Sequence, residues 1–211
     1  MAQHFGTDGV RGVANQKLTP EFALSLARAH GHILARQHGR CSVLLGCDSR
    51  ISSPMLECAY SAGLASVGID SVLLGVVPTP AVAWLTQNGP FAAGVMISAS
   101  HNPVPDNGIK LFGADGYKLS DALCLELESH LGSDSLERPT GVDIGNIRRD
   151  ESARLTYHNH LVQLCPESLA GLKVVLDCGH GAACELAPRL FQELGAEVVA
   201  IHSQADGHRI N

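Results

Sequence analysis

The sequence predicts an α/β fold, and three observations support this prediction. Short runs of apolar and β-branched residues, which are typical of buried strands, alternate with longer segments whose apolar residues recur every three or four positions. Ser-Pro or Thr-Pro stands at the start of several of these longer segments, as is common at helix N-termini. The chain of 211 residues is 45% hydrophobic and 17% charged, as in ordinary globular proteins. We therefore expect a three-layer α/β/α mixed-sheet domain followed by a second, incomplete α/β domain.

Helix and strand signals follow one another through the first part of the chain. Thr19-Pro20 begins a helix whose apolar face continues until Gly39, and Ser120 begins another by capping it. The strand at residues 109–112 follows directly on the loop before it, so we expect it to run antiparallel to a neighbour. The expected elements are helix 19–39, strand 42–46, helix 53–68, strand 72–77, a short helix from 79 to about 85, strand 94–97, strand 109–112 and helix 120–131.

A polar stretch at residues 132–152 interrupts this alternation and contains several turn-forming residues. We place the first domain at residues 1–140, a linker at 141–152 and a partial second domain at 153–211. The second domain is expected to contain a helix at about 153–165, a strand at 173–177, a helix at about 182–194 and a strand at 197–202.

Charge and cysteine usage limit the classes of partner. The formal net charge is -6 and no block of basic residues is present, so we expect no nucleic-acid surface. The seven cysteines form no C-x-x-C pair and are expected to be reduced thiols. The N-terminal sequence has no signal-peptide pattern, and no apolar run reaches the roughly 18 residues of a membrane span. We therefore expect a cytoplasmic protein without membrane association.

The segment from Gly94 to Leu111, GVMISASHNPVPDNGIKL, carries the strongest chemical signal. A buried strand ends there at a hydroxyl group, and the carboxyl ends of such strands are where α/β sheets bind ligands. Ser100 is a candidate nucleophile, His101 a hydrogen-bond donor or base, and Lys110 a cation that could reach the same phosphate. The alternative is a polar turn that only closes the strand.

Five motifs together resemble the alpha-D-phosphohexomutase family, and the resemblance covers essentially the whole chain. The branch that acts on glucosamine phosphate is the most similar. The motifs are FGTDGVRG at 5–12, CDSR at 47–50, GVVPTPAV at 75–82, ISASHNP at 97–103 with DNGIK at 106–110, and VVLDCGHGAA at 174–183.

The resemblance implies that Ser100 is carried as a phosphoserine. It would give its phosphoryl group to a hexosamine phosphate and recover one from a bisphosphate intermediate, interconverting glucosamine 6-phosphate and glucosamine 1-phosphate for amino-sugar and cell-wall precursor synthesis. Matching positions make Lys110 a general acid or base, His101 a contributor to acid–base chemistry, and Arg11 a cation beside the transferred phosphate. Such charge neutralisation supplies much of the rate in phosphoryl transfer.

The resemblance also implies binding groups, a metal ion and missing sequence. Thr7, Arg50 and Asn102 are expected to bind substrate or phosphate, although Cys47 stands where a basic residue is expected. One Mg²⁺ ion would be bound by Ser100 through its phosphate and by Asp residues beyond Asn211. We therefore expect the 211 residues alone to be an N-terminal fragment that does not turn over substrate.

Other functions remain open. A phosphomannomutase or phosphoglucomutase differs in sugar preference alone, and the sequence does not predict the oligomeric state. CGHGAAC at residues 178–184 resembles a dinucleotide-binding turn, but Cys184 replaces its third glycine. The alternatives of another class are accordingly a nucleotide-binding module and a non-catalytic module that binds sugar phosphate.

Overall fold

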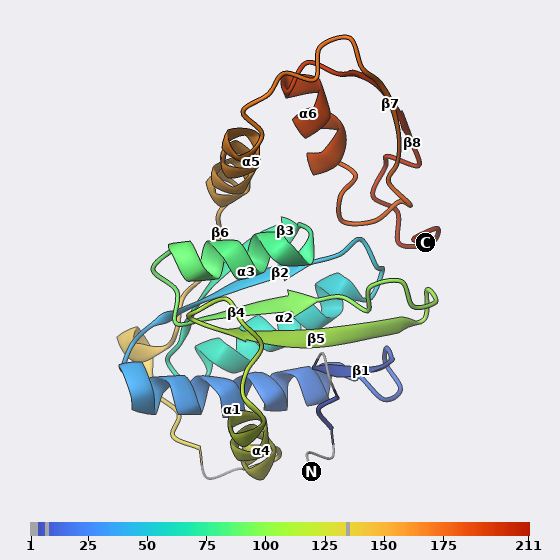
Figure 1. Cartoon of the computed structure of the whole chain (residues 1–211). Coiled ribbons are helices and arrows are strands. Elements are labelled where there is room, and N and C mark those ends of the chain that lie inside the picture. The colour runs from blue at the N-terminus through green and yellow to red at the C-terminus, as the bar shows by residue number, and fades with distance from the viewer. Residues whose placement is uncertain (1–3, 7–8, 134–135) are drawn as a thin grey trace.

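The computed structural model describes residues 4–6, 9–133 and 136–211 (Figure 1). Its largest feature is a six-stranded sheet, in which β2, β3, β4 and β6 run parallel and β5 is antiparallel to both β1 and β4. The predicted mixed sheet and the antiparallel return after residue 108 are therefore confirmed. In spatial order the strands are β1 (Val10–Val13), β5 (Asp106–Gly113), β4 (Ala93–Ile97), β2 (Ser42–Cys47), β3 (Asp70–Val76) and β6 (Ile147–Arg149).

Helices cover both faces of this sheet and give the expected three layers (Figure 1). On one face, α1 (Pro20–His38), α2 (Ser53–Ala65) and α4 (Asp121–His130) pack against the strands, and α3 (Thr79–Asn88) covers the other. The caps follow from the sequence: the Thr19 hydroxyl accepts a hydrogen bond from the Phe22 amide at 3.1 Å, and Ser120 caps α4 in the same way. The β1–β6 sheet with α1–α4 is the first unit.

Two short strands at the edges of the sheet were not expected from the sequence. β1 overlaps the end of the glycine-rich FGTDGVRG motif, and β6 lies in the polar stretch that we interpreted as a linker, beside a short 3₁₀ helix, η1 (Gly141–Asp143). All three residues of β6 are exposed, so its sequence has no apolar alternation to mark it. The pairing of β6 with β3 shows that residues 147–149 belong to the first sheet.

The second unit comprises residues 152–211 and lies beyond α3 (Figure 1). It contains α5 (Ser152–Leu164), β7 (Lys173–Asp177), α6 (Leu186–Glu193) and β8 (Glu197–Ile201), and its two strands pair in parallel. Trp84 of α3 stacks on His160 of α5 with ring centroids 4.0 Å apart, which joins the two units. Among the helices in the described ranges, none is long and apolar enough to cross a membrane.

Candidate functional site

Ser100 lies in the serine loop, residues 98–105, which connects the carboxyl end of β4 to β5. Its side chain is exposed and its φ of 57° lies in the left-handed region, which is uncommon for residues other than glycine. The Ser100 amide donates to the Ser98 hydroxyl at 3.0 Å, and His101 Nδ1 lies 3.4 Å from Ser100 Oγ. The strand thus presents one hydroxyl to solvent from a backbone conformation that the surroundings must hold.

Arg50 holds that conformation from beneath the loop. Its side chain is fully buried, and Nε donates to Asp48 Oδ2 at 3.1 Å. The two terminal nitrogens donate to four backbone carbonyls, those of Ser100 (3.0 Å), Asn102 (2.8 Å), Pro103 (2.7 Å) and Asp106 (3.0 Å).

This position differs from the expected role of Arg50 as a phosphate ligand. Protein oxygens already occupy all five N–H groups of the guanidinium. Asn102 is also engaged within the loop, because its Nδ2 donates to Asp106 Oδ2 at 2.9 Å. In this structure both residues shape the loop rather than face a ligand. Thr7, the third expected phosphate-binding residue, lies outside the described residues.

A buried polar network extends from Arg50 and was not foreseen from the sequence. Asp48 Oδ1 accepts from the Arg50 amide and from the Ser53 hydroxyl, both at 3.0 Å. Asn107 donates to the hydroxyls of Ser52 and Ser53 at 2.9 and 3.1 Å. Ser53, the first residue of α2, therefore belongs to this network. Asp48, Ser53 and Asn107 are all buried, and satisfied buried networks of this kind rigidify their surroundings. The available signal was a run of polar residues directly after the buried strand β2.

Arg11 and Lys110 lie on one face of the sheet. Arg11 of β1 is opposite Gly108 of β5, and Lys110 follows two positions later on β5, opposite Met96. Residues directly opposite one another in an antiparallel pair project to the same face. A side chain at Gly108 would come within 3.1 Å of Arg11 Cγ, so this glycine leaves room for the arginine. The register therefore brings the two expected cations together beside the strand that ends at the serine loop.

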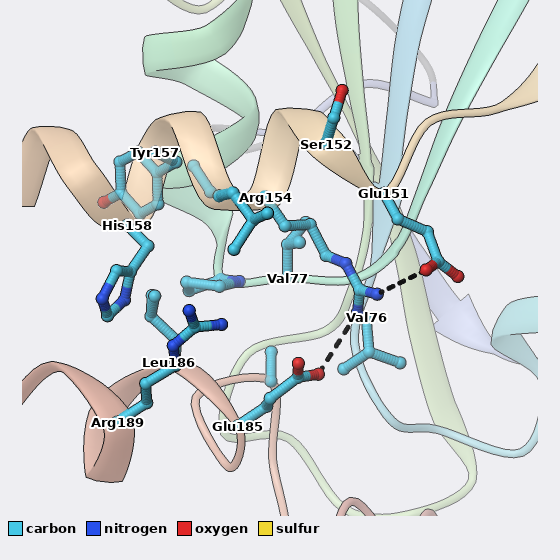
Figure 2. A pocket seen from close by; sticks show the side chains of 14 residues that line it. Val76, Val77, Glu151, Ser152, Arg154, Tyr157, His158, Glu185, Leu186 and Arg189 are labelled. Atoms are coloured by element: carbon cyan, nitrogen blue, oxygen red, sulfur yellow. Dashed lines mark hydrogen bonds and ion pairs between the residues drawn. The ribbon is translucent and has the colours of Figure 1, made fainter.

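A cavity lies elsewhere, between the two units (Figure 2). It has a volume of about 380 Å³, and its lining comes from the β3–α3 connection, α5 and the beginning of α6. Figure 2 shows Arg154 at its centre, where the guanidinium contacts Glu185 at 3.2 Å and Glu151 at 3.8 Å. The expected site residues that the structure describes lie outside this lining, and the serine loop is the candidate site on chemical grounds.

The described residues do not form a complete magnesium site. In the described ranges, no group of three or more His, Cys, Asp or Glu side chains is arranged to hold a metal ion. The two carboxylates of the hydrogen-bond network around the loop are engaged, Asp48 by Arg50 and Ser53, and Asp106 by Asn102. Mg²⁺ requires several oxygen ligands. The chain offers the Ser100 oxygen, and the magnesium ion stays a prediction.

The cysteines play no visible part in this site. All seven lie within the described ranges and are free thiols. Burial raises the pKa of the Cys47 thiol to about 12, and nearby Glu57 and Asp48 add to that effect. Cys47 therefore stays protonated and unreactive at neutral pH, although it directly precedes the loop that carries Asp48 and Arg50.

Fold and site together define a three-layer α/β/α protein with an exposed serine at the carboxyl end of a sheet strand. The family model described as "Phosphoglucomutase/phosphomannomutase, alpha/beta/alpha domain I" matches residues 2–138. The chain belongs to this family.

Curated proteins and solved structures extend the similarity over the whole chain. A phosphoglucosamine mutase of Moorella thermoacetica is 52% identical over 213 residues, an alignment that covers 100% of this chain and 48% of the relative. A phosphoglucomutase/phosphomannomutase family protein of Burkholderia thailandensis superposes with a TM-score of 0.87 at 29% identity, covering 100% of this chain and 46% of that protein. A putative phosphomannomutase of Thermus thermophilus superposes with a TM-score of 0.80 at 26% identity, covering 98% of this chain and 48% of that protein. The chain thus spans about half the length of the relatives that it matches.

Proposed function

We propose that this chain forms the phosphoryl-carrying part of a phosphosugar mutase that interconverts glucosamine 6-phosphate and glucosamine 1-phosphate. One observation carries the proposal: Ser100 is exposed at a strand end while a fully occupied, buried arginine holds its backbone in a left-handed conformation. The names of relatives such as the Moorella thermoacetica protein favour glucosamine phosphate as the substrate. The substrates are accordingly a hexosamine phosphate and its bisphosphate, in the cytoplasm, for amino-sugar and cell-wall precursor synthesis.

The proposed chemistry begins with a phosphate on Ser100 Oγ. A hydroxyl of the sugar phosphate attacks this phosphorus, the bond between Oγ and phosphorus breaks, and the hydroxyl proton passes to a base. The product is a sugar bisphosphate, and a second transfer in the opposite direction returns its other phosphate to Ser100. Each transfer conserves the phosphoryl group, so no net donor is consumed.

The residues around Ser100 have distinct roles in this proposal. Arg11 and Lys110, which share one face of the sheet, neutralise charge on the transferred group, and Lys110 exchanges the proton. His101 can donate to Ser100 Oγ or accept from it, since Nδ1 lies 3.4 Å away. Arg50 acts indirectly: by binding four carbonyls it keeps Oγ in one place, and positioning contributes much of the rate in such reactions.

One Mg²⁺ ion belongs to the proposal as a partner of the phosphorylated serine. Ser100 would bind it through a phosphate oxygen, and the remaining ligands would come from outside the described residues. When bound, the ion supplies positive charge to the phosphoryl group. Because those ligands are required for repeated turnover, we expect no steady-state interconversion of glucosamine phosphates by the 211 residues alone, whereas a single transfer to Ser100 is expected during a long incubation. Measurable turnover would contradict this expectation.

A second candidate is the same reaction on glucose or mannose phosphate. The description of the matching family model and the name of the Thermus thermophilus neighbour favour it. Competition between hexosamine, glucose and mannose bisphosphates for transfer to Ser100 would rank the three sugars. The nucleotide-binding alternative gains little support, because α6 begins only at Leu186, several residues after the glycines at 179 and 181.

The first test of the proposal is phosphate transfer to the chain itself. After incubation with glucosamine 1,6-bisphosphate, intact mass spectrometry should show one added phosphate per chain. Ser100→Ala should show none, whereas Ser133→Ala, a control at a distant turn, should be labelled like the original chain. Equal labelling of Ser100→Ala would contradict the proposal.

A further inference from the structure

The second unit contacts the loops around Ser100 directly. The Ser49 hydroxyl donates to the carbonyl of His180 at 2.6 Å. Asn211 bridges the units, because its amide donates to the Gly179 carbonyl at 3.0 Å and its Nδ2 donates to the Ser100 carbonyl at 3.0 Å. Two segments of the second unit, the turn after β7 and the chain after β8, therefore reach the carboxyl edge of the first sheet.

Gly207 makes the closest of these approaches. A Cβ atom at this position would lie 2.4 Å from Ser49 O, 2.5 Å from Ile51 N and 2.9 Å from the Arg50 carbonyl carbon. All three are backbone atoms, which cannot yield as a flexible side chain can. Gly207 is buried in this contact. The two backbones can therefore pack this closely only because residue 207 has no side chain.

The contacts of Gly207 and of Asn211 both involve groups that hold the Ser100 carbonyl. The backbone of Arg50 faces Gly207, and the guanidinium of Arg50 donates to the Ser100 carbonyl at 3.0 Å. Asn211 donates to that carbonyl from the other unit, also at 3.0 Å. The peptide that follows the left-handed Ser100 is thus held from the first unit by Arg50 and from the second by Asn211.

We propose that the segment 207–211 of the second unit is a positioning element for Ser100. Gly207 sets how closely this segment approaches the Arg50 backbone, and Asn211 fixes the Ser100 carbonyl. When the segment moves away, the Ser100 carbonyl keeps its hydrogen bond from Arg50 but loses the one from Asn211, and Ser100 Oγ leaves its position more often. The consequence for phosphate transfer rests on the proposed function, whereas the consequence for loop mobility does not.

The test compares Gly207→Ala with Gly181→Ala. At Gly181 the nearest atom to an added Cβ lies 3.5 Å away, an ordinary contact in the same unit. Hydrogen–deuterium exchange of peptides covering residues 98–106 should become faster in Gly207→Ala and stay unchanged in Gly181→Ala. Asn211→Ala, which removes a hydrogen bond without a clash, should increase exchange by a smaller factor. Unchanged exchange in both Gly207→Ala and Asn211→Ala would overturn the proposal.

Transfer kinetics provide a readout that a purely structural role would not move. From glucosamine 1,6-bisphosphate, Gly207→Ala should lower the maximal rate of Ser100 phosphorylation by roughly 10- to 100-fold, as expected for a displaced nucleophile, without changing the half-saturating concentration. An unchanged maximal rate would overturn the positioning role. If exchange increases as expected but even the original chain accepts no phosphate, the proposed function fails and the positioning contact stands.

Discussion

The two units are built differently, although both combine strands and helices. All five residues of β4 are buried, as are five of the six residues of β2, because helices cover both faces of the first sheet. β7 and β8 instead alternate exposed and half-buried positions, with Val175 64% and Val199 44% exposed. The first unit therefore supplies most of the hydrophobic stabilisation, and the second contributes through specific contacts with the loops of the first.

Their polar contacts differ in the same way. In the first unit, Arg50 and Asp48 form a buried ion pair whose remaining hydrogen-bonding groups are satisfied by the loop. In the second unit, Lys173 Nζ lies 2.7 Å from Glu197 Oε1, but both side chains are about two-thirds exposed. Water screens such a pair, so its contribution to stability is small. A short ion-pair distance therefore does not by itself measure how much the pair contributes to stability.

The largest effect is expected where the buried ion pair is broken. Arg50→Met should lower the free energy of unfolding by about 3–5 kcal/mol, because Asp48 and four loop carbonyls lose their donor inside the protein. Lys173→Met, which breaks the exposed pair, should change it by less than about 1 kcal/mol. Urea unfolding measures both values. Equal effects of the two substitutions would remove the distinction between the units.

A second comparison concerns apolar burial. Leu45→Ala in β2 removes a side chain that is completely buried and should lower the free energy of unfolding by about 2–5 kcal/mol. Val199→Ala in β8 should change the free energy of unfolding by no more than about 0.5 kcal/mol, since that side chain is already 44% exposed. Thermal and urea unfolding should agree on this order. If Val199→Ala lowered the free energy of unfolding more than Leu45→Ala does, the second unit would contribute more to the hydrophobic core than its exposed side chains indicate.

Acid stability should depend on the first unit through His30. Complete burial lowers the pKa of His30 to about 4, from an ordinary value of 6.5. The unfolded chain therefore binds a proton before the folded one does, so stability is full above pH 6.5 and decreases as the pH falls toward 4. The expected decrease is on the order of 3 kcal/mol.

Substitutions separate this effect from other groups that titrate. His30 Nδ1 lies 2.8 Å from the Tyr60 hydroxyl, so the double variant His30→Leu/Tyr60→Phe removes both polar partners and should flatten the pH profile between 6.5 and 4. Val199→Ala in the exposed second unit, which removes no titratable group, should leave the shape of the profile unchanged. Urea midpoints at several pH values provide the measurement. A profile that the double variant does not alter would assign the acid sensitivity to other residues.

Local sequence patterns predicted the elements that local forces determine. The apolar run of β4 and the caps at Thr19 and Ser120 appear where the sequence indicated them. β6 escaped notice because a three-residue exposed edge strand depends on its partner β3 and not on its own pattern. The start of α6 was also predicted about four residues too early, at residue 182. The helix begins at Leu186 because the preceding residues form a turn toward the first unit.

Site residues were predictable in kind but not in role. Pairing of β1 with β5 puts Arg11 and Lys110 on one face, in agreement with the expected pair of cations, although no sequence rule specifies that register. Arg50 was expected at a phosphate because its charge is visible in the sequence. Its actual partners are carbonyls about fifty residues away, and such long-range hydrogen bonds leave no local signal.

Two serines of the β4–β5 connection are candidate phosphate acceptors. Ser98 and Ser100 lie two residues apart, but Ser98 is buried and its hydroxyl accepts from the Ser100 amide, whereas Ser100 is exposed. Tandem mass spectrometry of the peptide that contains both serines, after incubation with glucosamine 1,6-bisphosphate, distinguishes them directly. We predict phosphate on Ser100 alone. Phosphate on Ser98, or on a residue outside the serine loop with none on Ser100, would contradict the account.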